Sequence, residues 1–573
     1  MNCHSYRELD VSEREIRLLV LAPAPQDSHE LTGSLTHVSL NGSPSYEALS
    51  YTWGRPPYQH RILIDGSVFH IGPNLEGALR ELRKPDEPRN LWVDALCINQ
   101  NDETERRQQV AEMQNIFSAA TQVLAWIGEA GEYGELAITL LEELQEEDLA
   151  AFRGARFESR EWKALKTFWS RPYWKRIWVV QELAVGSRRA LIGCGRKWIL
   201  RSKFERALDI LIAHRNNYET LLWEALESEM DWFLNLSLIC RNVAPSGEAE
   251  LNMQDLEYLL YLTEHFEATQ PHDHFFALLG LSQQIDRAAI PVDYSGCFAD
   301  ICAKVILHII QRTDSLNVLS GNRSKTENTL SSWMPSFSDP VRRGYGWNSF
   351  RTFQTAGNCI ASVTLSPCRR CLSCEGIEIG SISSFEGPFL NSKSEFLDAR
   401  AFVSMRRIAK RAFMLSRRHA LAPARNLLDR AFWESLFANR SVGIGFVNGS
   451  ADLSLEQFDA LVALLDEADT ESEDNLKSID DELHRCIVSL ICSLVSTLRF
   501  RCFFATSNGF IGVGPYNIKH GDLVVAFSGA DVPFVLRRND QEGYHLVGDA
   551  FVYGVMDGQL FGKGNKRQYF QLK

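Results

Sequence analysis

Leu91-Trp-Val-Asp-Ala-Leu-Cys-Ile-Asn-Gln100 is the stretch of sequence that decides the fold of the first third of the chain. Its apolar residues predict a buried strand, because a strand that is covered on both faces needs no alternation with polar side chains. The same stretch contains Asp94, Asn99 and Gln100, polar residues that a plain core strand does not require. We therefore expect a buried strand whose end carries functional side chains.

Two more segments combine an apolar framework with isolated polar or aromatic residues, one on each side of this stretch. They are Tyr46-Glu-Ala-Leu-Ser-Tyr-Thr-Trp-Gly54 and Trp178-Val-Val-Gln-Glu-Leu183. Within them, Ser50, Trp53 and Glu182 stand out from their apolar neighbours. Function is accordingly expected in the first third of the chain.

Strand-like and helix-like segments alternate in this region. Short apolar runs rich in branched and aromatic residues predict strands at residues 17–21, 46–52, 61–64, 91–98 and 123–127. A helix is predicted before the last of them, because Asp102 and Glu105 form a capping box ahead of an apolar stripe. The stripe consists of Val110, Met113, Phe117 and Ala120.

This alternation predicts an α/β domain over residues 1–200, built on a mostly parallel sheet with helices on both faces. Ligands bind such sheets beyond the carboxyl ends of the strands, where Asp94, Asn99 and Gln100 are expected. A further helix is predicted over residues 177–184, with Val179 and Leu183 on its apolar side and Glu182 on the other.

The remainder of the chain divides by its patterns. We expect a helical region over residues 201–345 and a mixed α/β connecting region over 346–500, with an acidic loop near 466–482. A small antiparallel β domain is expected over 501–573, because short apolar runs there are separated by turn glycines.

Composition excludes several classes of protein. A net charge of -13 over 573 residues argues against a nucleic-acid partner, since phosphate binding needs a clustered basic surface. No secretory signal and no transmembrane segment is expected, so the sequence predicts a soluble, cytoplasmic protein. Thirteen cysteines, an odd number, fit reduced thiols better than a disulfide framework.

Two short clusters have the residue types of metal sites. Cys368-Arg-Arg-Cys371-Leu-Ser-Cys374 contains one CxxC pair, but no second pair follows at a suitable distance. His272-Asp-His274 is better explained as a loop before the apolar run at 275–281. No metal site is therefore predicted, and whether the three cysteines bind a metal is left open.

The three quoted segments, in this order and spacing, resemble the fungal heterokaryon incompatibility (HET) domain. Later segments resemble the common architecture of such proteins: Phe276-Ala-Leu-Leu-Gly-Leu281 with Asp293-Tyr294-Ser295, then Ser332-Trp-Met-Pro335, then the tail Gly509 to Gly558. The resemblance implies a fungal protein of nonself recognition and programmed cell death. It also implies a fold similar to the Toll/interleukin-1 receptor (TIR) type, a flavodoxin-like sheet.

Many TIR domains cleave NAD at the nicotinamide–ribose bond with one glutamate on a helix, and the segment Trp178 to Leu183 is similar to their motif. The resemblance thus implies that Glu182 is catalytic, with NAD as a substrate and no cofactor. Cleavage passes through an oxocarbenium-like state that a nearby carboxylate stabilises. Side chains able to stack on rings, position hydroxyls or meet phosphates are the expected substrate-binding residues: Ser50, Trp53, Arg55, Asp94, Asn99, Gln100, Arg106 and Trp178.

Architectural roles compete with these assignments. Glu182 would equally pair with Arg176 or Arg106, and Asp94 would equally hydrogen-bond a loop. Trp92 and Trp126 are expected in the core. The rival function is a non-enzymatic signalling module that self-associates or binds an incompatibility partner through the same surface. The enzyme would be favoured by convergence on one open cleft of Glu182, Asp94, Ser50 and Trp53. A dispersed or buried arrangement of these residues would favour the module.

Overall fold

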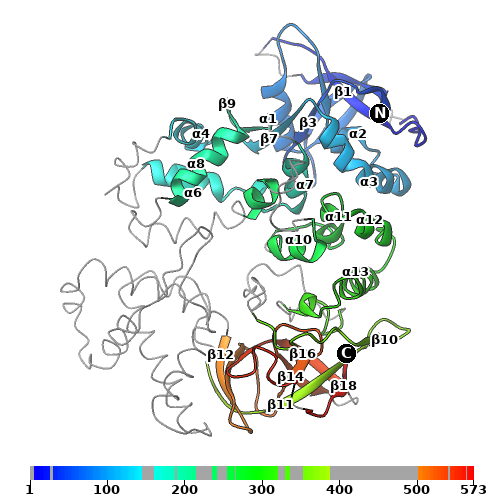
Figure 1. Ribbon diagram of the computed structural model, residues 1–573. Helices are drawn as coiled ribbons and strands as arrows, with labels where there is room; N and C mark the ends of the chain where they lie inside the picture. The colour runs from blue at the N-terminus through cyan, green and yellow to red at the C-terminus, as the bar shows by residue number, and fades with distance from the viewer. Residues whose placement is uncertain are drawn as a thin grey trace, which may run out of the picture. The chain divides into compact units, whose positions relative to one another are not determined.

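The computed structural model describes the chain in two compact units, Met1–Phe298 and Ala299–Lys573 (Figure 1). The residues it describes are 6–25, 30–144, 160–186, 190–213, 235–241, 254–264, 266–320, 330–335, 353–387, 501–539, 543–562 and 564–573. The predicted acidic loop near 466–482 lies outside them.

A nine-stranded sheet organises the first unit, in the order β5-β4-β2-β1-β6-β3-β7-β8-β9. The strands are β1 (Glu15–Leu21), β2 (Thr32–Ser39), β3 (Glu47–Ser50), β4 (His60–Ile64), β5 (Ser67–Ile71), β6 (Arg89–Trp92), β7 (Gln122–Gly128), β8 (Leu191–Cys194) and β9 (Lys197–Leu200). Each predicted strand of this region has a counterpart, but the prediction of one strand over residues 91–98 was wrong beyond Trp92. Residues Asp94–Cys97 form a short helix, at whose start the Asp94 carboxylate accepts the Ala95 backbone N–H. Trp92 and Trp126 are buried in the core as predicted.

The sheet is mixed, so the prediction of a mostly parallel sheet was wrong. Strands β6, β3, β7 and β8 run parallel at its centre, whereas β1 pairs antiparallel with both β2 and β6. Strands β4 and β5 form a hairpin around Asp65-Gly66, where both residues have positive φ. That dipeptide favours a two-residue turn and forces antiparallel pairing, a signal present in the sequence.

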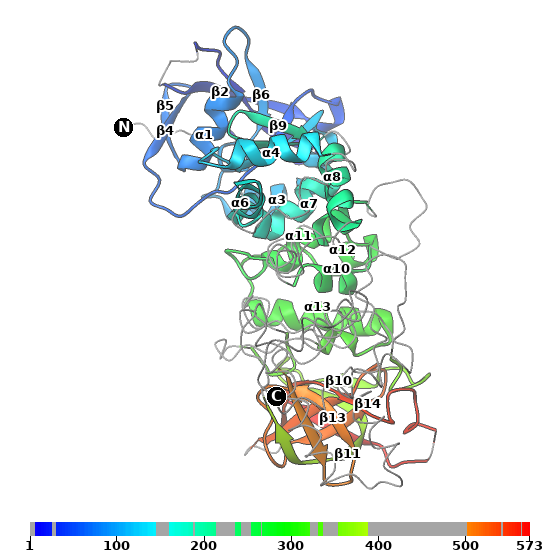
Figure 2. The ribbon, with the colours of Figure 1, turned by 90° about the vertical axis from the view of Figure 1, so that its left-hand side faces the viewer.

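Helices pack on this sheet and on one another (Figures 1 and 2). They are α1 (Pro73–Leu82), α2 (Asp94–Cys97), α3 (Glu103–Ala119), α4 (Gly134–Glu143), α6 (Arg160–Trp169), α7 (Ile177–Val185), α8 (Arg201–Ala213), α10 (Leu256–Leu262), α11 (Asp273–Leu279) and α12 (Gln284–Ala289). The predicted helix 177–184 is α7, which contacts β7, α3 and α11. It is therefore covered on more than its apolar side.

Helix α3 begins as predicted, but its capping box is incomplete. The Asp102 side chain accepts hydrogen bonds from the backbone N–H groups of Thr104 and Glu105. Glu105 does not reach back to Asp102. Its carboxylate instead pairs with the buried Arg17 guanidinium, with N–O distances of 2.5 and 3.0 Å, which fastens α3 to β1.

The second unit contains α13 (Phe298–Thr313) and a sheet that closes on itself. Its strands are β10 (Val363–Leu365), β11 (Leu372–Glu386), β12 (Arg501–Thr506), β13 (Ile511–Pro515), β14 (Leu523–Phe527), β15 (Phe534–Asn539), β16 (Gly543–Asp549), β17 (Phe551–Val552) and β18 (Gln568–Leu572). Because β11 pairs with both β14 and β18, the strands β11, β14, β15, β16 and β18 form a ring. Antiparallel pairing dominates, as predicted for the C-terminal β unit.

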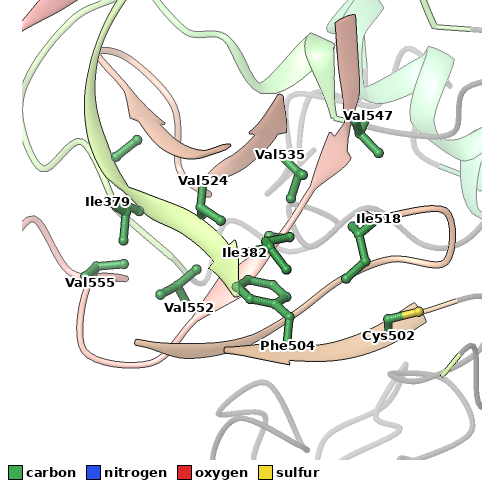
Figure 3. Close-up of a cluster of buried hydrophobic side chains, with 12 residues drawn as sticks. Ile379, Ile382, Cys502, Phe504, Ile518, Val524, Val535, Val547, Val552 and Val555 are labelled. Atoms are coloured by element: carbon green, nitrogen blue, oxygen red, sulfur yellow. The ribbon is translucent and has the colours of Figure 1, made fainter. Parts of the chain in front are cut away.

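Apolar side chains fill the interior of this unit (Figure 3). Phe504 from β12 lies among branched side chains such as Ile382, Val524 and Val552, all almost fully buried. No helix among the described residues has the length and hydropathy needed to cross a bilayer.

Candidate functional site

Glu182 and Ser50, both singled out in the sequence, meet in the first unit. Ser50 is the last residue of β3, and its hydroxyl donates to the Glu182 carboxylate on α7. The Tyr173 hydroxyl lies 2.7 Å from the same Ser50 oxygen. Each of these three side chains is buried, and Glu182 has only 2% of its surface exposed. The carboxylate is sealed from solvent by its neighbours.

Arg176 supplies the nearest cation. One of its guanidinium nitrogens lies 3.8 Å from the Glu182 carboxylate, and the same nitrogen donates to the Tyr51 carbonyl oxygen. The predicted alternative pairing of Glu182 with Arg176 is confirmed. The charge of Arg176 also acts on the carboxylates of Asp94 and Asp273. We call Asp94, Arg176, Glu182 and Asp273 the Arg176 cluster.

Asp94 is the first residue of α2, two residues after β6 ends. Its carboxylate accepts the Trp53 indole N–H at 2.8 Å and the Ala95 backbone N–H at 2.8 Å. Trp53 and Asp94 are both half-buried. The hydrogen bond fixes the edge of the Trp53 ring against Asp94, so two residues from different sequence segments act as one structural element.

Asp273 brings in a segment from much further along the chain. It is the first residue of α11, and its carboxylate accepts hydrogen bonds from the Tyr294 hydroxyl, at 2.7 Å, and from the Trp178 side chain. Trp178, expected beside Glu182, is thus tied to a different carboxylate. The Arg106 guanidinium lies 5.3 Å from the centre of the Tyr294 ring, a cation–π contact. Arg106 consequently does not pair with Glu182.

Burial and Arg176 act against each other on these carboxylates. Burial raises the pKa of Glu182, Asp94 and Asp273, while the Arg176 guanidinium lowers it again. The negative charge of Asp94 also raises the pKa of Glu182. Three carboxylates therefore share one guanidinium that cannot neutralise all of them.

The other expected binding residues have mostly structural partners. The Gln100 amide donates to the Asp94 backbone carbonyl at 2.9 Å, and the Asn99 backbone N–H donates to Glu105 at 2.7 Å. Both contacts shape the loop between α2 and α3. Arg55 is exposed in the loop after β3. The structure thus brings together Ser50, Trp53, Asp94, Trp178 and Glu182. Asn99 and Gln100 instead shape a loop, and Arg55 is exposed to solvent.

Sequence reasoning missed Tyr173 and Asp273 as members of the site. The His272-Asp-His274 segment was expected to be a loop, whereas Asp273 opens α11 and is largely buried. The α7 side chain Gln181 links α11 to α7. With its amide oriented to hydrogen-bond, it donates to the Ala277 carbonyl at 2.9 Å and accepts from the Gln114 backbone N–H at 2.8 Å. Such long-range pairing leaves no local pattern.

Comparison with known families matches the same region. A family model described as heterokaryon incompatibility protein (HET) matches residues 46–182, and a Het-6 beta-barrel domain model matches residues 451–572. The resemblance to the HET domain seen in the sequence is confirmed over residues 46–182. The HET match begins just before Ser50 and ends at Glu182, so the HET domain contains three of the four members of the Arg176 cluster. Asp273 comes from beyond its end.

A curated fungal relative resembles the whole chain. It is heterokaryon incompatibility protein 6, OR allele, of Neurospora crassa, 24% identical over 99% of this chain and 98% of the relative. No solved structure matches the chain. The TIR-like, flavodoxin-like architecture expected for the HET domain therefore stays a prediction.

Proposed function

We propose that this chain acts in heterokaryon incompatibility, the nonself response of filamentous fungi, and that its HET domain triggers cell death in that response. The HET match over residues 46–182 supports the proposal, as does the incompatibility relative aligned with 99% of the chain. The observation that carries it structurally is the Arg176 cluster. Two of its carboxylates, Glu182 and Asp273, are buried, and a buried carboxylate is costly to a core unless it has a use.

The proposed chemistry is hydrolysis of NAD at the nicotinamide–ribose bond. Glu182 would stabilise the positive charge that develops on the ribose, since a carboxylate favours an oxocarbenium-like state. The half-buried indoles of Trp53 and Trp178 lie in the same region and offer flat faces to the rings of the substrate. Asp94 would accept hydrogen bonds from sugar hydroxyls.

The observed conformation is proposed to be a resting state. Glu182 is sealed by Ser50, Tyr173 and Arg176, so a substrate reaches it only after α7 moves away from β3. Self-association, or binding of an incompatibility partner, is the proposed trigger for that movement. Such a partner must bind the opened state more tightly than the resting state.

The same burial favours a second function. At 2% exposure Glu182 has the environment of an architectural residue, hydrogen-bonded by one hydroxyl and paired with one guanidinium. In this alternative the HET domain signals by oligomerisation or partner binding, without chemistry. The two functions differ in one observable, which is consumption of NAD before death.

The test is expression of the full chain in a fungal host, with cell death and the cellular NAD pool measured together. Wild type is expected to deplete NAD before cells die. Glu182→Gln keeps a group that accepts the Ser50 hydrogen bond but removes the carboxylate, so it is expected to abolish both effects. Death of wild-type cells with an unchanged NAD pool would establish the signalling module instead. Full viability under strong expression, with no trigger found, would contradict both.

The matched control is Glu135→Gln, which removes a carboxylate from α4 in the same unit and outside the Arg176 cluster. It is expected to leave death and the NAD pool as in wild type. Thermal unfolding of each purified variant checks that loss of effect is not loss of fold.

A further inference from the structure

The hairpin that enters the C-terminal barrel carries a pair of cysteines in a defined turn. Residues 366–371 connect β10 to β11. The Ser366 N–H donates to the Cys371 carbonyl at 2.9 Å, and the Arg369 N–H donates to the Ser366 carbonyl at 2.8 Å. Arg369 adopts a positive φ of 57°, which closes the turn. Cys368 and Cys371 are therefore held in one short loop.

One hydroxyl connects the two cysteines. The Ser366 oxygen lies 3.2 Å from the Cys368 sulfur and accepts the Cys371 backbone N–H at 3.0 Å. Because the oxygen already accepts from Cys371, its own proton is available to donate to Cys368. That arrangement suits a sulfur that carries negative charge. Cys368 is exposed, whereas Cys371 is half-buried.

The loop stabilises the thiolate of Cys368. The Ser366 hydroxyl, followed by the peptide N–H of Arg370, lowers the pKa of the Cys368 thiol, and the N–H groups of Cys368 and Cys371 add to the effect. Cys374, further along β11, is the opposite case, because burial raises its pKa. Thiolate is the reactive form of cysteine, so Cys368 is the nucleophile of this segment.

Metal binding is the alternative use of a CxxC pair. Within the part of the chain that the structure describes, no group of three or more His, Cys, Asp or Glu side chains is arranged to hold a metal ion. A structural zinc site needs four ligands. The buried sulfur of Cys374 does not join the two loop cysteines, so these residues offer a dithiol.

We propose that Cys368 and Cys371 form a redox-active dithiol that hydroperoxides oxidise to a disulfide. The Cys368 thiolate attacks the terminal oxygen of the hydroperoxide and the O–O bond breaks. The sulfur becomes a sulfenic acid, and alkoxide leaves, or hydroxide when the oxidant is hydrogen peroxide. The Cys371 thiol then attacks that sulfur. The S–S bond forms, the S–O bond breaks, and the departing hydroxide takes the thiol proton and becomes water. Two molecules of a cellular thiol reverse the change by successive exchanges and leave joined as their own disulfide.

A buried tryptophan of the second unit contacts the loop that holds the two cysteines. The buried Trp333 donates its indole N–H to the carbonyl of Arg370, one of the two residues between the cysteines, at 3.1 Å. Next to Trp333, the Ser332 N–H donates to the Lys573 carbonyl at 2.9 Å. Closing the disulfide changes the turn whose Arg370 carbonyl accepts from Trp333. Through Trp333 the change reaches the neighbouring hydrogen bond between Ser332 and Lys573.

The experiment treats the reduced full-length protein with hydrogen peroxide and maps its cysteines by mass spectrometry. The expected product is a 368–371 disulfide, reversed by dithiothreitol. In Cys371→Ser the reaction is expected to stop at a Cys368 sulfenic acid that dimedone traps. Alkylation by iodoacetamide at neutral pH is expected to be several-fold faster at Cys368 than at Cys297, another exposed thiol. Ser366→Ala is expected to remove much of that advantage.

Cys359→Ser is the matched control, since Cys359 precedes the same hairpin but lies outside the loop. It is expected to form the disulfide as wild type does. The proposal fails if Cys368 reacts no faster than Cys297, or if peroxide pairs cysteines without preference for 368 and 371. It also fails if the reduced protein binds stoichiometric zinc that protects both thiols.

Discussion

Arg176 is expected to contribute substantially to the stability of the HET domain. Two unit charges at the observed 3.8 Å separation of Arg176 and Glu182 interact by about 4 kcal/mol at an effective dielectric constant of about 20. Removing one partner of a buried pair costs about 3–5 kcal/mol, because the other charge stays behind. The Arg176 side chain is 19% exposed, which places the estimate at the lower end. Arg176→Gln should therefore lower the free energy of unfolding of the first unit by about 3 kcal/mol.

The pH dependence of this loss has a definite sign. The pKa values of Glu182, Asp94 and Asp273 are raised by burial in the folded state. A carboxyl with a raised pKa stabilises the fold fully below its unfolded pKa of about 4, and this contribution is lost as pH rises through the folded value. Without the lowering effect of Arg176 these pKa values rise further. The gap between wild type and Arg176→Gln should therefore widen from pH 5 to pH 8.

Native-state hydrogen exchange on the full chain is the appropriate assay, because two compact units need not unfold together. The amides of α7 and β3 report the opening free energy of the HET domain. Arg55→Gln, an exposed change in the same unit, should alter it by less than about 0.5 kcal/mol. Equal protection in Arg176→Gln and wild type, or a gap that narrows as pH rises, would refute the reasoning.

Three further predictions concern other contacts. Glu105→Ala leaves the buried Arg17 without its carboxylate and should cost about 3–5 kcal/mol by denaturant unfolding, whereas an unchanged midpoint would show the pair to be dispensable. Asp273→Asn can still accept hydrogen bonds and should cost less than Asp273→Ala, which leaves Tyr294 and Trp178 unsatisfied; similar losses by thermal unfolding would contradict the role assigned to Asp273. Phe504→Ala leaves a cavity in the barrel core and should lower the free energy of unfolding of the second unit by about 3–5 kcal/mol. A decrease below about 1 kcal/mol would mean that the core is poorly packed around Phe504.

The elements that the sequence predicted well are those with local signals. Apolar runs located the central strands of the HET domain, and Asp102 located the start of α3. Strand direction was missed where a short turn decided it, as at Asp65-Gly66. Periodicity alone reports which side chains lie on one face, but the direction of neighbouring strands depends on the connections between them.

The burial of the site was the least predictable feature. The helical wheel of α7 placed Glu182 and Gln181 on the polar side, yet both are 2% exposed. Helix α11 covers that side, and it is separated from α7 by a long stretch of sequence. Contacts of α7 with α3 and β7 as well as with α11 override its amphipathicity, since each of these elements buries part of the helix.

The measurement that tests the account most directly is release of nicotinamide from NAD by the concentrated, purified full chain. Wild type is expected to release it under conditions of self-association, and Glu182→Gln, folded to the same extent, is expected to release none. Equal release by both proteins would remove Glu182 from the chemistry. No release by assembled wild type would leave the Arg176 cluster as architecture and the HET domain as a signalling module.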